Sequence, residues 1–149
     1  MKDCNILLVE DNPDDAELTM LAFEESRLCN DIVVARDGEE ALDYLFKTGK
    51  YTGNDIKLPS VILLDLKLPK ISGLDVLKRI RSDESTQCLP VIILTSSKED
   101  EDILSSYKLG ANAYVRKPVD YNQFVEATKT VGLFWLLLNE PPPLNRSCK

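Results

Sequence analysis

The chain has 149 residues, of which 44% are hydrophobic, and it carries a formal net charge of −7 with no histidine. This composition is typical of one globular domain, and the negative charge disfavours nucleic acid and anionic membranes as direct partners. Because histidine is missing, Ser-His-Asp triads, histidine-based acid-base catalysis and histidine-containing zinc sites are excluded.

Strand-like and helix-like segments alternate five times along the chain. Strands are predicted over residues 6–9, 32–35, 61–64, 91–94 and 113–115, and helices over residues 13–27, 38–46, 74–81, 99–108 and 121–138. Three of the strands are continuous apolar runs, which is typical of strands buried on both faces of a parallel sheet. The alternation implies an α/β protein with a doubly wound sheet, whose functional site lies at the carboxyl ends of the strands.

Two segments fall outside this alternation. Residues 47–60 form a long polar connection, which predicts a surface loop. Residues 140–149 include three consecutive prolines, which cannot continue a helix. We expect residues 1–139 to form the domain and residues 140–149 to form a Pro-rich C-terminal tail.

The cysteines and the apolar runs of the sequence indicate the cellular compartment of the protein. The four cysteines lack C-x-x-C spacing, which predicts free thiols rather than a disulfide scaffold or a metal site. The first apolar run is interrupted by Glu10 and Asp11, unlike a secretion signal. The longest apolar stretch, residues 131–138, is far shorter than the roughly 20 residues of a membrane span. We therefore expect a cytoplasmic protein.

Three carboxylates follow two of the predicted strands. Glu10 and Asp11 come after the first strand and Asp65 after the third, so the sheet places them along one edge. A single Asp in such a place is more often a helix cap or a solvated charge. Three together repel one another unless a divalent cation lies among them, and oxygen ligands suit Mg²⁺. The sequence therefore predicts a magnesium site.

A hydroxyl and an ammonium group are expected at the same edge. Thr95 ends the fourth strand and Lys117 follows the fifth. Alone, each is more often an ordinary strand-terminal hydroxyl or surface charge. Beside the carboxylates, the lysine supplies positive charge and the hydroxyl a hydrogen bond for phosphoryl oxygens, as an acceptor site for phosphoryl transfer requires.

Four ordered motifs now give a resemblance to a known family. They are Val9-Glu-Asp-Asn12, Leu64-Asp-Leu-Lys-Leu-Pro69 followed by Ser72-Gly73, Leu94-Thr95, and Arg116-Lys-Pro118. In this order, over roughly residues 5 to 138, the sequence resembles the response regulator receiver domains of two-component systems. The resemblance implies a flavodoxin-like fold of five parallel strands in the order 2-1-3-4-5 with five helices.

The resemblance also implies a role for each site residue. Asp65 would be the phosphoacceptor, forming 4-aspartylphosphate, and Lys117 would bind the phosphoryl group. The Mg²⁺ ligands would be Asp65, Asp11, Glu10 through water and the backbone carbonyl of Lys67. Thr95 and Tyr114 resemble the pair of residues that switches conformation on phosphorylation, and the Lys117-Pro118 bond is expected to be cis.

The sequence departs from the family pattern at two positions. Glu10 stands where many receivers have a second Asp, and Ser96 follows the switch threonine where a small apolar residue is common. A longer carboxylate and an added hydroxyl change the space around the site. Metal affinity and the access of small phosphodonors therefore depend on these two side chains.

The last predicted helix carries more apolar residues than one buried face can hold. Phe124, Thr128, Val131, Trp135 and Leu138 follow the helical period and predict core packing. Leu133, Phe134, Leu136 and Leu137 fall on the remaining faces. We interpret these four as candidates for a homodimer surface, with cover by the tail as the alternative.

Within the receivers, the chain resembles the small stand-alone regulators that pair with phytochrome-type histidine kinases. The features are residues 10–17, the long loop before the third strand and the Phe134-Trp135 helix end. The implied partner is a histidine kinase, the implied cofactor is Mg²⁺, and the receiver turns over no separate substrate.

Three alternatives differ in class. A Mg²⁺-dependent phosphatase would need an Asp two residues after the nucleophile, where this chain has Lys67. An interaction module that is not phosphorylated would not need Asp11, Asp65, Thr95 and Lys117 together. A flavodoxin-type electron carrier would need a Gly-rich phosphate loop after the first strand.

Overall fold

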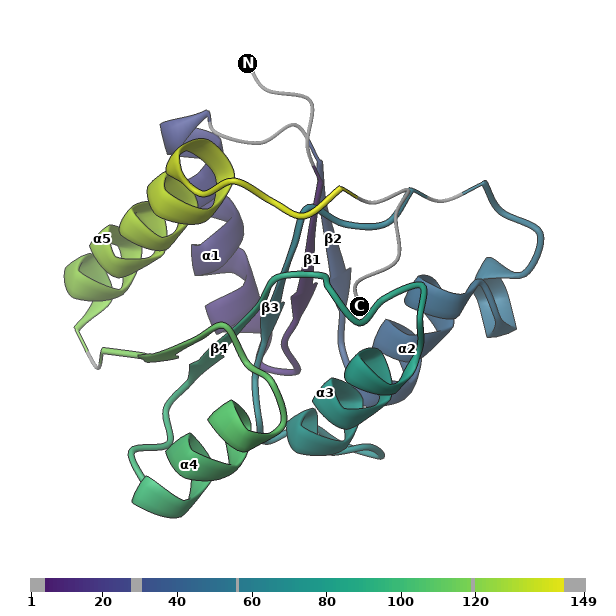
Figure 1. Cartoon of the computed structure of the whole chain (residues 1–149). Coiled ribbons are helices and arrows are strands. Elements are labelled where there is room, and N and C mark those ends of the chain that lie inside the picture. The colour runs from purple at the N-terminus through teal and green to yellow at the C-terminus, as the bar shows by residue number, and fades with distance from the viewer. Residues whose placement is uncertain (1–4, 28–30, 56, 119, 144–149) are drawn as a thin grey trace.

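The computed structural model of the chain describes residues 5–27, 31–55, 57–118 and 120–143. These residues contain a parallel sheet made of β1 (Asn5–Val9), β2 (Asp31–Ala35), β3 (Val61–Leu64), β4 (Val91–Thr95) and β5 (Ala113–Arg116). The strands lie in the order β2-β1-β3-β4-β5 (Figure 1). The predicted doubly wound α/β fold and its strand order are confirmed.

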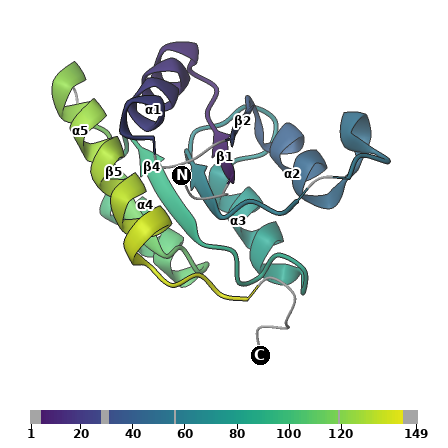
Figure 2. The ribbon, with the colours of Figure 1, turned by 90° about the horizontal axis from the view of Figure 1, so that it is seen from above.

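Helices cover both faces of this sheet. They are α1 (Pro13–Ser26), α2 (Gly38–Phe46), α3 (Gly73–Ser82), α4 (Asp100–Lys108) and α5 (Tyr121–Gly132). The pair α1 and α5 lies on one face and the pair α2 and α3 on the other, with α4 next to α3 (Figures 1 and 2). The helix starts follow from the sequence, because Asn12, Asp37, Ser72 and Asp120 each cap a helix by accepting backbone N–H groups.

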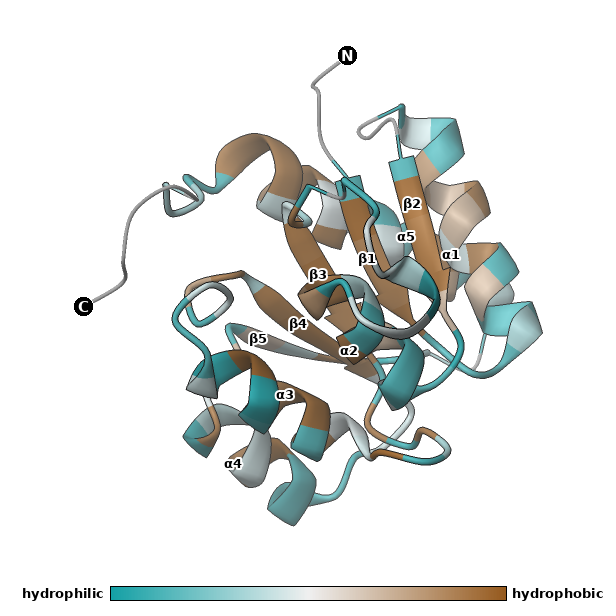
Figure 3. Cartoon of the chain, turned by 90° about the vertical axis from the view of Figure 1, so that its right-hand side faces the viewer, coloured by the Kyte–Doolittle hydropathy of each residue, from teal (hydrophilic) through white to brown (hydrophobic). Residues whose placement is uncertain are grey.

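Strand residues alternate between two hydrophobic cores. Leu7 and Ile62 pack with α2 and α3 in one cluster, whereas Ile6, Leu8 and Leu63 pack with α1 and α5 in the other. Every residue of β3 and β4 is buried, and the strands form the apolar centre of the molecule in Figure 3. Burial on both faces explains why these strands read as continuous apolar runs.

A side chain from α3 ties together the loops at the amino end of β4. The Arg81 guanidinium donates to the carbonyl oxygens of Gln87, Leu89 and Gly110 at 2.9, 2.8 and 2.9 Å, and to Asn112 Oδ1 at 2.8 Å. The same amide oxygen accepts from the first backbone N–H of β4 at 2.8 Å. We name this group the Arg81 clamp. It fixes the entries of β4 and β5 relative to α3.

The end of the last helix differs from the prediction. After α5 the chain continues as a π-helix, Leu133–Leu138. The buried positions recur every four residues, so Leu136 is 4% exposed and lies in the core, whereas Leu138 is 64% exposed. Placing Leu136 on a dimer surface and Leu138 in the core was therefore wrong, because a π-helical turn holds more residues than an α-helical turn.

Two smaller expectations can be compared with the structure. The described part of residues 47–60 contains a short 3₁₀ helix, Gly49–Tyr51, whose Tyr51 ring packs edge-on against Tyr44. Cys88, the cysteine within the described ranges, is disulfide-bonded, so the expectation of free thiols is wrong for this residue. C-x-x-C spacing identifies only cysteines that are near in sequence, and a disulfide can join residues far apart.

Across the described residues, no helix has the length and apolar character needed to cross a membrane.

Candidate functional site

Parallel pairing brings the three predicted carboxylates together at the carboxyl edge of the sheet. Val9 of β1 pairs with Leu64 of β3, so the residues that follow them are neighbours. Ligand oxygens of Glu10, Asp11 and Asp65 all lie within 4.8 Å of one another. Glu10 and Asp65 are buried, at 2% and 7% exposure, whereas Asp11 is exposed. The site is therefore open to solvent on the Asp11 side.

Lys117, which follows β5, reaches across this edge to the carboxylates. Its Nζ lies 3.0 Å from Asp65 Oδ2 and 3.0 Å from Asp15 Oδ2, and it also donates to Glu10 Oε1. The backbone positions it, because Lys117 N donates to the carbonyl oxygen of Thr95 at 2.7 Å. The buried ammonium group of Lys117 thus offsets the electrostatic repulsion among Glu10, Asp15 and Asp65.

The charged side chains of Glu10, Asp65 and Lys117 shift one another's pKa values. Burial raises the pKa of Glu10 from 4.5 to about 7, despite its bond to Lys117. Burial also acts to raise the pKa of Asp65, but the Lys117 charge and a hydrogen bond from Thr95 outweigh it and leave that pKa lowered. Burial opposes the charge of Lys117, yet its carboxylate partners raise its pKa. Asp65 is therefore the more acidic carboxylate of the pair.

Thr95 and Tyr114 are joined through the loop that follows β4. Thr95 is fully buried, and its Oγ1 accepts from the Ser97 backbone N–H at 3.5 Å. Tyr114 Oη donates to the Ser97 carbonyl oxygen at 2.9 Å. Ser97 Oγ donates to Asp102 Oδ2, in the first turn of α4, at 2.6 Å. The Ser97 loop therefore connects the site hydroxyl, the tyrosine and α4.

Gly73 holds α3 directly against the segment that contains Asp65. Its N–H donates to the carbonyl oxygen of Leu66 at 2.9 Å. A Cβ at this position would lie 2.2 Å from the backbone carbonyl oxygen of Asp65, so no side chain fits. The N–H of Lys67 lies 3.4 Å from Asp65 Oδ1. The loop after β3 is thus packed tightly between Asp65 and α3.

The residues present fit a divalent cation. Three carboxylates from two strand ends converge without enough positive charge of their own, since among the described residues Lys117 alone forms ion pairs within the group, with Glu10 and Asp65. An oxygen-only donor set is what Mg²⁺ and Mn²⁺ prefer. Glu10, Asp11 and Asp65 could hold such an ion.

Two site features differ from or add to the sequence interpretation. The described residues contain no cis peptide bond, so the expectation of a cis Lys117-Pro118 bond is wrong. The isomers of an X–Pro bond differ by only about 0.5–1 kcal/mol, which sequence alone does not resolve. The sequence interpretation did not include Asp15 as a Lys117 partner, although its place in the first turn of α1, just after β1, puts it near the same edge.

Together, fold and site define a flavodoxin-like α/β protein with a carboxylate, hydroxyl and lysine centre at its strand ends. The sequence matches the model of the response regulator receiver domain family over residues 6–129. The chain belongs to this family of two-component regulators.

Several relatives of known structure or sequence are similar over nearly the whole chain. The response regulator Rcp1 of Synechocystis sp. is 34% identical, with 88% of each chain covered. The phosphorylated cyanobacterial phytochrome response regulator RcpA is 37% identical, with a TM-score of 0.89 over 95% of this chain and 100% of RcpA. The bacteriophytochrome response regulator AtBRR is 53% identical, with a TM-score of 0.73 over 94% and 100%.

One related structure contains a metal ion. The Mn²⁺-bound form of Rcp1 is 32% identical to the chain, with a TM-score of 0.88 over 94% of this chain and 99% of Rcp1. By sequence and structure the chain is thus close to the cyanobacterial phytochrome response regulators.

Proposed function

We propose that the chain is a single-domain response regulator that accepts a phosphoryl group from a histidine kinase onto Asp65 in a Mg²⁺-dependent reaction. The observation that carries the proposal is the contact of 3.0 Å between Lys117 Nζ and Asp65 Oδ2 beside the buried Thr95 hydroxyl. A nucleophile, a cation and a hydrogen-bond donor are the parts that phosphoryl transfer requires.

In this reaction an Asp65 carboxylate oxygen attacks phosphorus and forms an O–P bond. The P–N bond to the kinase histidine breaks, and its electron pair returns to the imidazole. Lys117 and Thr95 then hold the phosphoryl oxygens by charge and hydrogen bonding. Glu10, Asp11, Asp65 and the Lys67 carbonyl are the proposed Mg²⁺ ligands, and the ion when bound neutralises charge that develops in transfer. The receiver itself promotes its phosphorylation and dephosphorylation, with no separate substrate.

Signalling would follow from the Ser97 loop. Movement of Thr95 toward the phosphoryl group alters the loop whose carbonyl holds Tyr114 and whose hydroxyl holds α4. The populations of the two arrangements then shift on the face formed by α4, β5 and α5. The alternative is an interaction module that is not phosphorylated in the cell.

The partner and its setting are inferred from the relatives. RcpA is a phytochrome response regulator and AtBRR a bacteriophytochrome response regulator, and we infer a phytochrome-type kinase for this chain. A cytoplasmic location fits such a partner. We keep residues 1–139 as the receiver and residues 140–149 as its tail. The net charge of −7 disfavours nucleic acid and anionic membranes as partners.

A homodimer through the last helix is part of the proposal. Leu133, Phe134 and Leu137 are 45%, 48% and 53% exposed, and Leu138 adds to the same apolar end of the helix, visible in Figure 3. Exposed apolar side chains that are contiguous mark association surfaces. We expect Leu137→Glu to give a monomer in sedimentation experiments, while the equally exposed Leu104→Glu on α4 stays dimeric. The reverse result would move the interface to α4.

The phosphorylation proposal is tested by intact-protein mass spectrometry. The chain is treated with phosphoramidate or a phosphorylated phytochrome-type kinase, with and without Mg²⁺. We expect a labile gain of one phosphoryl group that requires Mg²⁺ and is lost in Asp65→Asn. Asp75→Asn, an exposed acid on α3, is the matched control and should react normally. No gain with either donor would support the unphosphorylated module instead.

A further inference from the structure

Lys117 is shared by three carboxylates, although only two of them belong to the proposed metal site. An ammonium group has three N–H donors. In the described residues these donors bind Glu10 Oε1, Asp65 Oδ2 at 3.0 Å and Asp15 Oδ2 at 3.0 Å. The carboxylates that converge as candidate metal ligands are Glu10, Asp11 and Asp65, and Asp15 is not among them. Asp15 can therefore keep Lys117 when a cation takes the other two partners.

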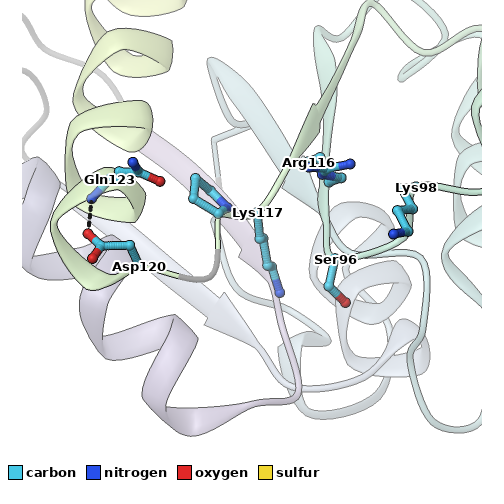
Figure 4. Close-up of a pocket in the computed structure, with 7 residues that line it drawn as sticks. Ser96, Lys98, Arg116, Lys117, Asp120 and Gln123 are labelled. Carbon is cyan, nitrogen blue, oxygen red and sulfur yellow. Dashed lines mark hydrogen bonds between the residues drawn. The ribbon is translucent and has the colours of Figure 1, made fainter.

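The side chain of Lys117 is directed to the acids at the ends of β1 and β3 and at the start of α1, and not to the start of α5. Asp120 is the acid nearest to it in the sequence, but Asp120 Oδ1 accepts from the backbone N–H of Gln123 at 3.0 Å. Figure 4 shows the Lys117 side chain pointing away from both of these residues. Its side chain is only 7% exposed. Because an unpaired buried charge is costly, Lys117 needs a carboxylate partner in every state of the site.

Asp15 is held in place by two hydrogen bonds of its backbone. It lies in the first turn of α1, where the side-chain oxygen of Asn12 accepts from its N–H at 3.2 Å. Its carbonyl oxygen accepts from the buried hydroxyl of Thr19 at 2.8 Å. The neighbouring Asp14 is exposed and forms no ion pair with any other described residue. The carboxylate of Asp15 is thus fixed beside Lys117, whereas that of Asp14 is solvated.

A divalent cation at the proposed metal site would compete with Lys117 for oxygens of Glu10 and Asp65. Two positive groups a few ångströms apart repel each other, and the repulsion is strong where water is largely excluded. An ammonium group that is also bound to Asp15 can release the oxygens of Glu10 and Asp65 without losing every partner. The third carboxylate therefore favours the entry of the cation.

We propose that Asp15 is a positioning residue that sets the affinity of the site for Mg²⁺ by holding Lys117 when the cation binds Glu10 and Asp65. The inference rests on the proposed function, because it takes Mg²⁺ as the ion of that site. Without the carboxylate of Asp15, Lys117 directs all its bonding to Glu10 and Asp65. The cation must then displace a buried ammonium group that has lost its third partner, and cation binding becomes weaker.

The first test measures Mg²⁺ binding to the unphosphorylated chain by amide chemical shifts. Asp15→Asn removes the charge and keeps a side chain of the same size. We expect its Kd for Mg²⁺ to be roughly three- to tenfold higher than that of the native chain. Asp14→Asn makes the same change of net charge at the preceding residue and should stay within about twofold of the native Kd. Asp15→Glu retains the carboxylate and should bind Mg²⁺ more tightly than Asp15→Asn.

A double-mutant cycle tests whether Asp15 acts through Lys117. In the Lys117→Met background the ammonium group is absent, so Asp15→Asn should change the Kd by less than about twofold. An equal rise of the Kd in both backgrounds would mean that the Asp15 charge attracts the cation directly, and it would overturn the positioning role. A rise of the same size in Asp14→Asn would also overturn it, because net charge alone would then explain the affinity.

Labelling kinetics give a second readout of the same role. With phosphoramidate as the donor, the Mg²⁺ concentration at half-maximal rate should be roughly three- to tenfold higher in Asp15→Asn than in the native chain. The rate at saturating Mg²⁺ should fall by a smaller factor. A rate that falls equally at every Mg²⁺ concentration would contradict a role in cation affinity.

The outcomes separate this inference from the proposed function. If the native chain is labelled but Asp15→Asn has the native dependence on Mg²⁺, the inference fails and the proposed function stands. If Mg²⁺ binding changes as expected but neither phosphoramidate nor the kinase labels the native chain, phosphorylation fails and the role of Asp15 stands. If the native chain binds no Mg²⁺, the metal site and the role of Asp15 both fail.

Discussion

The two ends of the β4 and β5 pair are held by different kinds of hydrogen bond. At the amino end, the Arg81 clamp binds three backbone carbonyl oxygens and Asn112 through one planar guanidinium. At the carboxyl end, Thr95, Ser97, Tyr114 and Asp102 are joined by single hydrogen bonds to rotatable hydroxyls and one loop.

This difference suits the amino end for supporting the fold and the carboxyl end for changing conformation. A guanidinium that binds several carbonyls cannot release one without losing the geometry of the others. A hydroxyl can turn to a new partner at little cost, and each bond is worth about 1 kcal/mol. Under the proposed function, the end of the sheet that changes on phosphorylation is therefore the end held by independent, weak bonds.

The largest expected effect comes from removing the clamp. Arg81→Met leaves three loop carbonyls and Asn112 without their donor, and should lower the free energy of unfolding by about 4 kcal/mol. Urea denaturation measures this. Lys78→Met, on the exposed side of the same helix, should change stability by less than about 0.5 kcal/mol. If Arg81→Met and Lys78→Met had the same free energy of unfolding, the clamp would not support the fold.

A second prediction concerns pH in the metal-free protein. The pKa of Glu10 rises from 4.5 in its ordinary state to about 7 in the fold. A folded state that binds the extra proton loses stability as the pH rises through this window. Relative to Glu10→Gln, the native chain in EDTA should therefore lose on the order of 3 kcal/mol between pH 5 and pH 8.

Stability measured over the same pH range for Arg81→Met tests whether the two ends of the β4 and β5 pair differ in their pH dependence. Arginine stays charged throughout this range, so the stability difference between native chain and Arg81→Met should not vary with pH. The lowered pKa of Asp65 acts in the opposite direction, but only below its ordinary value of 3.8, outside the window. If the stability difference between the native chain and Glu10→Gln did not vary with pH, this result would contradict the raised pKa of Glu10.

The smallest expected effect is at the Ser97 loop. Ser97→Ala removes the bond of 2.6 Å to Asp102 and should cost about 1 kcal/mol of stability. It should also speed amide hydrogen exchange in the first turn of α4, because that turn loses its tie to the loop. Ser105→Ala, on the same helix, is the control. Unchanged exchange at α4 would mean that Ser97 does not transmit the switch.

Hydrophobic patterns in the sequence predicted the helices, the parallel strands and the meeting of Glu10, Asp11 and Asp65 at the strand ends. The order of the strands was implied by the resemblance to receiver domains. The sequence did not predict the roles of Ser97 and Asp102, whose contact depends on how one loop turns. Leu136 was misplaced because a π-helical end changes the phase of a helical pattern. Contacts that depend on side-chain rotation, or on one extra residue in a helical turn, produce no periodic pattern in the sequence.

The fit of Gly73 against the carbonyl oxygen of Asp65 also limits protein engineering. Because a Cβ there would lie 2.2 Å from that oxygen, the acceptor loop and the start of α3 form one inseparable part. Transplanting Asp65 and its neighbouring carboxylates into another scaffold would therefore fail unless residues 65–73 and the helix behind them were moved together. A designed sensor built on this chain should carry its reporter groups elsewhere.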